Sequence, residues 1–219
     1  DFCLSRGLGD VYKRQDVDML VTINPVTSTI LMTSIPRDSY VEEVCDDYAC
    51  NYGAYDKLTH TGIYGVDTTK ATVENLLGID VNYVFRVNFT SMIDIVDALG
   101  GIDIDVAEGM AVSRFYTNST LEGVHEGTNH LDGKRALAYS RERKAYIDGD
   151  VQRARNQQQV LQAMFKKATS PEIITKYTSL LKALTHAFDT NMSTKEITSF
   201  IKYQIQAKPS WKFEQYVLK

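Results

Sequence analysis

Apolar residues near the start of the chain occur in two short runs that are typical of β-strands. Residues 17–23 and 29–35 are rich in Val, Ile, Leu, Met and Thr, and the sequence Asn-Pro-Val-Thr-Ser separates them. This pattern predicts a β-hairpin with its turn between the two runs. With the centre of the turn near Val26 and Thr27, position 16 comes level with position 37 at the open end of the hairpin.

Segments with helical periodicity then alternate with short strand-like segments. Asp67 stands where a helix N-cap is expected, and Gly78 stands where that helix ends. The predicted elements are helices at 68–77 and 91–99 and strands at 81–89 and 102–106. This alternation favours the α/β class, and we expect an α/β/α sandwich in which helices on both faces cover a central mixed β-sheet.

The C-terminal half is predicted to be mainly helical. A helix is expected to begin at Asp150, its predicted N-cap, and to end near Lys167. Its apolar stripe consists of Val160, Leu161, Met164, Phe165 and Ala168. The later elements are helices near 171–187 and 193–206 and a strand at 211–218. Residues 107–130 are polar, and we expect a long connection that contacts the substrate, with Arg114 and Tyr116 as candidates.

Composition sets the class of protein. The chain has 219 residues, 43% of them hydrophobic, and a formal net charge of −4. This length can bury one sizeable core, so we expect a single domain over 14–219, truncated at both ends, after a doubtful leader at 1–13 that reads as foreign or artefactual sequence. No apolar run reaches the roughly 20 residues that cross a bilayer. The acidic balance and the lack of a basic stripe argue against nucleic-acid binding.

Four arginines lie close together in this acidic chain, at 141, 143, 153 and 155. Arg141 and Arg143 point the same way only if residues 139–143 are extended, and we expect them to be so. Arg153 shares a helix row with Gln157 and Leu161, so its charge is expected to enter a cleft or to meet a buried partner. Arg155 is expected on the solvated face. The cluster predicts a site for an anion.

A second candidate site lies at the open end of the hairpin. The predicted pairing brings Asp16 level with Arg37 and Asp38. Carboxylates beside an arginine suit a hard cation and a phosphate held together. The other interpretation is a surface ion pair of little energetic value. Asp18 is the weaker ligand candidate, because it is expected to face outward.

The cysteines and one histidine give weaker signals. Cys45 and Cys50 bracket a short acidic loop, which permits a local disulfide of the kind found outside the cell. A zinc site is the alternative, but four ligands at usable spacing are missing. His60 is expected to be a structural hydrogen-bonding residue.

Four sequence blocks, in this order, resemble the LytR-CpsA-Psr family of cell-envelope glycopolymer transferases. The resemblance covers roughly 14–206. The blocks are Asp16 to Pro25 with Ser34-Ile35-Pro36-Arg37-Asp38; Asp56-Lys57-Leu58-Thr59-His60 with Gly62 to Gly65; Val87-Asn88-Phe89 with Asp97 to Gly101; and Leu131-Asp132-Gly133 through Ala138 to Arg143, Gly149-Asp150, Arg153 and Gln157-Gln158.

The resemblance implies a membrane-anchored phosphotransferase at the extracytoplasmic face of the bacterial cell membrane. Such an enzyme moves a glycopolymer, for example wall teichoic acid or capsular polysaccharide, from undecaprenyl pyrophosphate to peptidoglycan and forms a phosphodiester. The implied partners are the polyprenyl-linked glycopolymer, the peptidoglycan acceptor and the membrane, through an N-terminal anchor that is expected to be missing here. Nucleic acid is not expected as a partner.

The resemblance also assigns residue roles. Asp16 matches the aspartate that binds Mg²⁺, with Mn²⁺ as a possible substitute. The residues expected to bind the pyrophosphate are Arg37, Arg141, Arg143, Arg153 and Gln157. Asp38 either orients or deprotonates the incoming hydroxyl or clamps Arg37. The four arginines and Asp38 together form the predicted catalytic set.

Two departures from the family pattern are present. An upstream Asp-x-Arg element has no match at residues 4–7, and Asn156 stands where some members carry arginine. Two other functions stay open: a non-catalytic binder of polyprenyl phosphate or anionic polymer, which needs the arginines but not Asp16, and a pyrophosphatase, in which water replaces the sugar hydroxyl.

Overall fold

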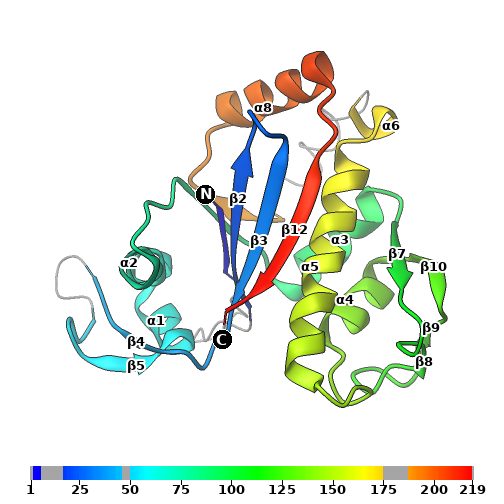
Figure 1. The fold of residues 1–219 in the computed structure, drawn as a ribbon, viewed down its shortest axis with the longest axis horizontal. Helices are drawn as coiled ribbons and strands as arrows, with labels where there is room; N and C mark the ends of the chain where they lie inside the picture. Colours follow the sequence, from blue (N-terminus) through cyan, green and yellow to red (C-terminus); the bar gives the residue numbers. More distant parts are fainter. Residues whose placement is uncertain (1, 6–16, 46–49, 175–186, 219) are drawn as a thin grey trace. The chain divides into compact units, whose positions relative to one another are not determined.

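The computed structural model describes residues 2–5, 17–45, 50–174 and 187–218. The chain forms two compact units. The first contains residues 1–88, 188–200 and 209–219, and the second contains residues 89–187 and 201–208. Each unit is described separately, and Figure 1 shows the elements of both. The prediction of one domain from residue 14 stays a prediction.

A six-stranded mixed sheet forms the centre of the first unit. Its strands are β1 (Phe2–Ser5), β2 (Asp18–Asn24), β3 (Thr29–Ile35), β6 (Tyr83–Arg86), β11 (Asp189–Thr190) and β12 (Lys212–Val217). Their order is β11-β6-β1-β2-β3-β12, and β2, β3 and β12 lie side by side in Figure 1. The β1–β6 and β3–β12 pairs are parallel and the other pairs are antiparallel. Residues 2–5, assigned from the sequence to a doubtful leader, thus form a strand of this sheet.

The predicted hairpin is confirmed with its register. Strand β2 pairs with β3 from Asp18 opposite Ile35 to Asn24 opposite Thr29. The Asn24 side chain accepts hydrogen bonds from the backbone of Val26 and Thr27 and so stabilises the turn. Asp18 is only 1% exposed, so its predicted outward orientation is wrong. The reason is that both faces of β2 are covered here, since the successive residues Asp18, Met19, Leu20 and Val21 are all buried.

Two helices pack beside the sheet in the first unit. They are α1 (Leu58–Tyr64) and α2 (Val66–Leu77). A buried cluster joins them to β3 and to the short strand β4 (Tyr40–Glu42), through Ile35, Val41, Leu58 and Val73. Gly78 ends α2 as predicted, in the left-handed conformation at φ 64°. Asp67 lies inside the first turn and Gly65 occupies the N-cap, so the helix begins two residues earlier than predicted.

Helix α8 (Thr194–Ala207) begins where the sequence predicts. Ser193 and Glu196 form a reciprocal cap: the Ser193 amide donates to the Glu196 carboxylate at 2.8 Å, and the Glu196 amide donates to Ser193 Oγ at 3.3 Å. The same carboxylate accepts the Tyr83 hydroxyl at 2.7 Å. The start of α8 is therefore joined to strand β6.

The second unit has its own buried core. Its elements are α3 (Phe89–Ala98), β7 (Ile102–Val106), β8 (Val112–Arg114), β9 (Glu122–Val124), β10 (Gly127–Leu131), α4 (Gly133–Arg141), α5 (Gly149–Ala168) and α6 (Pro171–Ile174). The largest fully buried side chains of its core are Phe115, Ile102, Leu131 and Tyr139. No helix in the described part of the chain is long and apolar enough to cross a membrane.

Residues 107–130 are not the long irregular connection predicted from their polarity. Strand β8 pairs with β9, and β10 pairs with β7. The apolar residues Val112, Phe115 and Val124 are buried, with Phe115 at 0% exposure, and they pack this segment into the core of the second unit. A Cβ at Gly123 would lie 1.7 Å from the carbonyl oxygen of Val112, so only glycine permits the close approach of β9 to β8.

Candidate functional site

The stretch from Arg141 to Arg153, called here the arginine segment, belongs to the second unit and begins at the end of helix α4. Asp132 caps this helix by accepting the Arg135 amide at 2.8 Å. The helix continues to Arg141, so the predicted extended conformation is wrong for residues 139–141, while Glu142 is extended. Tyr139 is 2% exposed and packs in the core, and this burial favours a helix there over the alternation of a strand.

Arg141 is held by an aromatic ring rather than by a carboxylate. Its guanidinium carbon lies 4.2 Å from the centre of the Phe89 ring. A cation over the face of an aromatic ring is attracted by the ring and keeps its charge, which leaves it able to bind an anion. Phe89 therefore orients Arg141 without neutralising it.

Glu142 is the residue that the sequence interpretation missed. Its side chain is 0% exposed. It accepts backbone hydrogen bonds from Arg143 and Lys144 at 3.0 Å and from Ala145 at 3.3 Å, and one from Tyr116 at 2.6 Å. One carboxylate thus holds the turn that carries Arg143 and fastens it to the segment after β8. An acidic residue between two arginines looks like a simple charge partner, so the sequence carries no signal of this role.

Asp150 brings two of the predicted arginines together. Its Oδ1 lies 3.6 Å from the Arg143 guanidinium and 3.2 Å from that of Arg153. Asp150 is not the N-cap of α5, because the helix begins at Gly149 and Asp148 takes the cap position without a side-chain bond. Arg153 is 21% exposed on its side chain, which confirms its partial burial, and its acidic partner is 70% exposed.

The buried face of α5 differs from the predicted apolar stripe. Asn156, Gln158, Val160 and Ala163 are buried, and Ala168 is exposed. The Asn156 amide donates to the Tyr139 carbonyl at 3.1 Å and accepts from Gln152 at 2.9 Å. Polar residues therefore occupy the N-terminal part of the buried row, ahead of the predicted apolar stripe. Arg155 is exposed as predicted, and Gln157 is half-buried.

Glycine at 149 permits the close contact between α5 and the arginine segment. A Cβ at this position would lie 2.7 Å from the backbone oxygen of Arg143. We expect Gly149→Ala to lower the free energy of unfolding by about 1 to 3 kcal/mol through overpacking. Thermal unfolding followed by circular dichroism measures this. A rise in Tm, the usual result of replacing glycine by alanine in a helix, would contradict the prediction.

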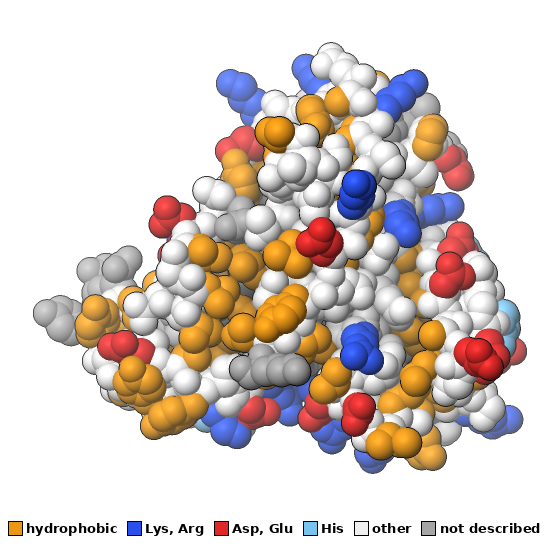
Figure 2. Space-filling view, viewed as in Figure 1, with side chains coloured by type: hydrophobic (Ala, Val, Ile, Leu, Met, Phe, Trp, Pro, Cys, Tyr) orange, Lys and Arg blue, Asp and Glu red, His pale blue; other side chains and the backbone are white. Residues whose placement is uncertain are grey.

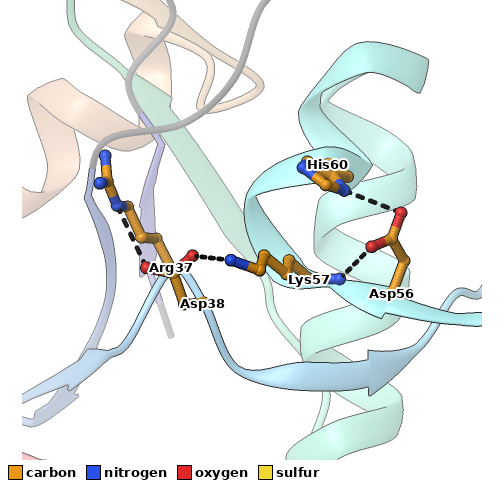
Figure 3. A network of polar contacts seen from close by, with 5 residues as sticks. All are labelled: Arg37, Asp38, Asp56, Lys57 and His60. Atoms are coloured by element: carbon orange, nitrogen blue, oxygen red, sulfur yellow. Dashed lines mark hydrogen bonds and ion pairs between the residues drawn. The ribbon is translucent and has the colours of Figure 1, made fainter.

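In the first unit, Arg37 and Asp38 lie in a chain of polar contacts (Figure 3). Arg37 Nε lies 3.6 Å from Asp38 Oδ2, and Lys57 Nζ lies 2.8 Å from Asp38 Oδ1. The hydrogen bond from Lys57 and the charge of Lys57, with a smaller effect of Arg37, lower the pKa of Asp38. Lys57 is a cation of this site that the sequence interpretation did not single out, although it stands in a family block.

The chain of contacts continues from Lys57 to His60. The Lys57 amide donates to Asp56 Oδ1 at 2.7 Å, and Asp56 Oδ2 lies 2.8 Å from His60 Nδ1. The contact with His60 lowers the pKa of Asp56. His60 is therefore the structural hydrogen-bonding residue that was predicted. Backbone bonds from Thr59 to Arg37 and from Leu58 to Ser39, both 2.9 Å, dock the Arg37 turn onto the start of α1.

The remaining candidates are only partly described. Asp16, the predicted metal ligand, lies outside the described residues, as do the residues 175–186 of the predicted third helix. Among the residues that the structure describes, no group of three metal-ligating side chains occurs. Tyr116 is 67% exposed, and its backbone amide donates a hydrogen bond to the Glu142 carboxylate. Arg114 ends strand β8 and is exposed.

Cys45 and Cys50 form the disulfide that the sequence analysis preferred. Their Cα atoms are 6.0 Å apart. The bridge closes the ribbon formed by β4 and β5 (Tyr55–Lys57), which pair in antiparallel register. With both sulfur atoms in one bond, this pair does not supply thiolates to a zinc ion.

Comparison with known proteins identifies a family. The LytR_cpsA_psr family model matches residues 5–216. The polyisoprenyl-teichoic acid--peptidoglycan teichoic acid transferase TagU of Bacillus anthracis is 36% identical over 192 residues, which cover 86% of this chain and 58% of that protein. The chain therefore spans little more than half the length of this curated relative.

Solved structures share the fold. Protein gbs0355 of Streptococcus agalactiae matches with a TM-score of 0.83 and 28% identity, covering 100% of this chain and 76% of that one. A structure described as TagT bound to LI-WTA matches with a TM-score of 0.78 and 32% identity, covering 99% and 77%. These matches confirm the predicted α/β fold class. The chain belongs to the LytR_cpsA_psr family.

Proposed function

We propose that this chain is the catalytic domain of a phosphotransferase that moves a glycopolymer from undecaprenyl pyrophosphate to peptidoglycan. The observation that carries the proposal is the arginine segment of the second unit. Arg143 and Arg153 share Asp150, and Arg141 lies on the Phe89 ring. The relative from Bacillus anthracis is named as a teichoic acid transferase to peptidoglycan, which supports teichoic acid or a similar polymer as the cargo.

The chemistry assigned to these residues is electrostatic. In the proposed reaction a sugar hydroxyl of the acceptor attacks the phosphorus that carries the glycopolymer. A new P–O bond forms, the bridging P–O bond of the pyrophosphate breaks, and polyprenyl phosphate leaves. Arginines stabilise the charge that develops on the phosphoryl oxygens, because fixed guanidinium groups need little reorganisation during the reaction. Gln157 is proposed as a further substrate contact.

Asp38 and Arg37 are assigned to the same reaction. Arg37 is proposed to bind a phosphate oxygen. The lowered pKa of Asp38 makes it a weak base at neutral pH, so we assign it to orient the incoming hydroxyl as a hydrogen-bond acceptor while it clamps Arg37. The proton is then lost to solvent as the P–O bond forms.

Magnesium, with manganese as a substitute, is the proposed metal ion. When bound, such an ion would neutralise pyrophosphate charge. This proposal rests on the sequence match at Asp16, since the described residues contain no group of three metal ligands. The roles assigned to the arginines do not depend on it.

The proposed place of action is the extracytoplasmic face of the bacterial cell membrane. The support comes from three sources: the polyisoprenyl and peptidoglycan substrates in the name of the relative, the Cys45–Cys50 disulfide, and the rarity of disulfides in reducing compartments. Membrane anchoring through a segment outside this chain is part of the same proposal.

Native mass spectrometry of the domain mixed with undecaprenyl phosphate tests the anion site. We expect a lipid adduct that disappears in Arg153→Ala and persists in Arg155→Ala. Arg155 is the matched control, because it lies two residues away on the same helix and is exposed. An adduct of equal strength in Arg153→Ala, or no adduct with the unmodified domain, would contradict the assignment of this segment as the lipid phosphate site.

A further inference from the structure

The ribbon of β4 and β5 has one buried face and one open face. Tyr40 pairs with Lys57, Val41 with Asp56, and Glu42 with Tyr55. Side chains alternate between the two faces of a strand. Tyr40, Glu42, Tyr55 and Lys57 therefore share one face, while Val41 is 2% exposed and packs on the other.

Two tyrosine rings lie close together on the open face. The centroids of Tyr40 and Tyr55 are 5.6 Å apart, with the ring planes at 36°. The two residues are 73% and 56% exposed. Figure 2 shows hydrophobic and tyrosine side chains gathered over this ribbon at the lower left of the view. Most of the surface of both rings is open to solvent, so packing in the core does not account for two aromatic residues at these positions.

The ribbon is held in place by several independent contacts. The Cys45–Cys50 disulfide closes it, and the Glu43 amide donates to the Ala54 carbonyl at 2.8 Å. The Val44 amide donates to Thr72 of α2 at 3.1 Å. Two rings on such a support lose little conformational entropy when a ligand covers them, and this favours a binding surface.

The tyrosine pair adjoins the polar contacts of Figure 3. Lys57, on the same face as the rings, holds Asp38 through its ammonium group at 2.8 Å. Tyr40 follows Asp38 by two residues. A ligand on the rings thus lies next to the carboxylate that we assign to orient the incoming hydroxyl.

The charges of this region favour a ligand that is not strongly anionic. On the open face the ammonium of Lys57 already contacts Asp38, and the carboxylate of Glu42 stands opposite Tyr55. A phosphate-rich polymer over the rings would meet the carboxylate of Glu42, whereas a neutral sugar needs no cation. Tyrosine combines an apolar ring with a hydroxyl, which matches the C–H face and hydroxyl edge of a pyranose.

We propose that Tyr40 and Tyr55 form a carbohydrate subsite for the acceptor, a glycan strand of N-acetylated amino sugars, beside Asp38. The inference rests on the proposed function, because it identifies the acceptor side of that reaction. The subsite binds the strand by stacking and presents its hydroxyl to Asp38. It requires no phosphate on the ligand.

A titration with chitotetraose, a soluble N-acetylglucosamine oligomer without phosphate, tests the subsite by ligand-observed NMR. We expect the unmodified domain to bind it, and Tyr40→Ala combined with Tyr55→Ala to weaken binding about tenfold. Tyr40→Phe, which keeps the ring, should bind nearly as the unmodified domain does. Tyr216→Ala is the control, since Tyr216 is 51% exposed on a different strand.

Three results would overturn the subsite: no binding by the unmodified domain, unchanged binding by the double variant, or an equal loss in Tyr216→Ala. Because the rings are exposed, the variants should keep the Tm of the unmodified domain, which excludes unfolding as the cause of a loss. The lipid adduct is measured separately. Loss of chitotetraose binding with an intact adduct therefore supports the subsite, while a missing adduct with intact sugar binding contradicts the proposed function instead.

Discussion

Arg143→Ala is expected to lower the rate of glycopolymer transfer by about 100-fold to 1,000-fold, the cost of removing one preorganised donor to developing charge. Its guanidinium lies beside Asp150, and its backbone is fixed by Glu142. The chain therefore orients this group before the substrate binds. Transfer of a labelled polymer from its lipid carrier to peptidoglycan, measured under single-turnover conditions, gives the rate.

Two further variants separate charge from geometry at this position. Arg143→Lys keeps the charge but loses the planar fork, so we expect only partial recovery. Arg155→Ala should keep full activity, since its side chain lies on the exposed face. Full activity of Arg143→Ala would remove Arg143 from the reaction and leave Arg141 and Arg153 as the candidates.

Glu142→Ala is expected to be the most destabilising of the substitutions considered. Four backbone amides, those of Tyr116, Arg143, Lys144 and Ala145, donate to this fully buried carboxylate. Removing it leaves several of these donors unsatisfied, at a cost of about 3 kcal/mol or more. For a chain of this size that corresponds to a decrease in Tm of about 6 to 12 °C. Differential scanning calorimetry measures it.

Glu108→Ala is a suitable control, because Glu108 is an exposed acid in the same unit. Its Tm should stay within a degree or two of the unmodified domain, as exposed sites usually contribute about 0.5 kcal/mol or less. Glu142→Gln keeps one acceptor oxygen and should lie between the two. A small effect of Glu142→Ala would mean that water replaces the carboxylate as the acceptor.

The parts of the fold that could be predicted are those in which local signals agree. The hairpin of β2 and β3 has β-rich runs on both sides of an Asn-Pro turn, and its register follows from the centre of that turn. Helix α2 ends at Gly78, because glycine takes the left-handed conformation without steric cost. Strand β7 matches its predicted bounds at 102–106.

The parts that failed depend on contacts distant in sequence. Residues 139–141 were expected to be extended because two arginines two positions apart suggested a common face, but the buried Tyr139 makes them helical. Asp150 has the features of an N-cap, yet two guanidinium groups recruit it. Asn156 lies one turn before Val160 on the buried row of α5, but its bond to the Tyr139 carbonyl joins two helices and could not be predicted from periodicity.

The candidate site was predicted in its residue types more than in its connections. The sequence singled out Arg37, Asp38, Arg141, Arg143 and Arg153, and their catalytic roles stay predictions. It gave no sign of Lys57 as the partner of Asp38, since that contact joins a turn to strand β5 across 19 positions. The pattern of charges along the sequence does not reveal residues such as Glu142, which orient the arginines by accepting hydrogen bonds from the backbone.

The Cys45–Cys50 bridge has a practical consequence for work with this protein. A bacterial cytoplasm used for overproduction keeps thiols reduced, so protein from that source would lack the covalent link that helps to hold the ribbon carrying Tyr40 and Tyr55. Two batches of identical sequence could then differ in their binding of sugars while their spectra of secondary structure agree. Thiol titration of each batch would have to precede any comparison of affinities between laboratories.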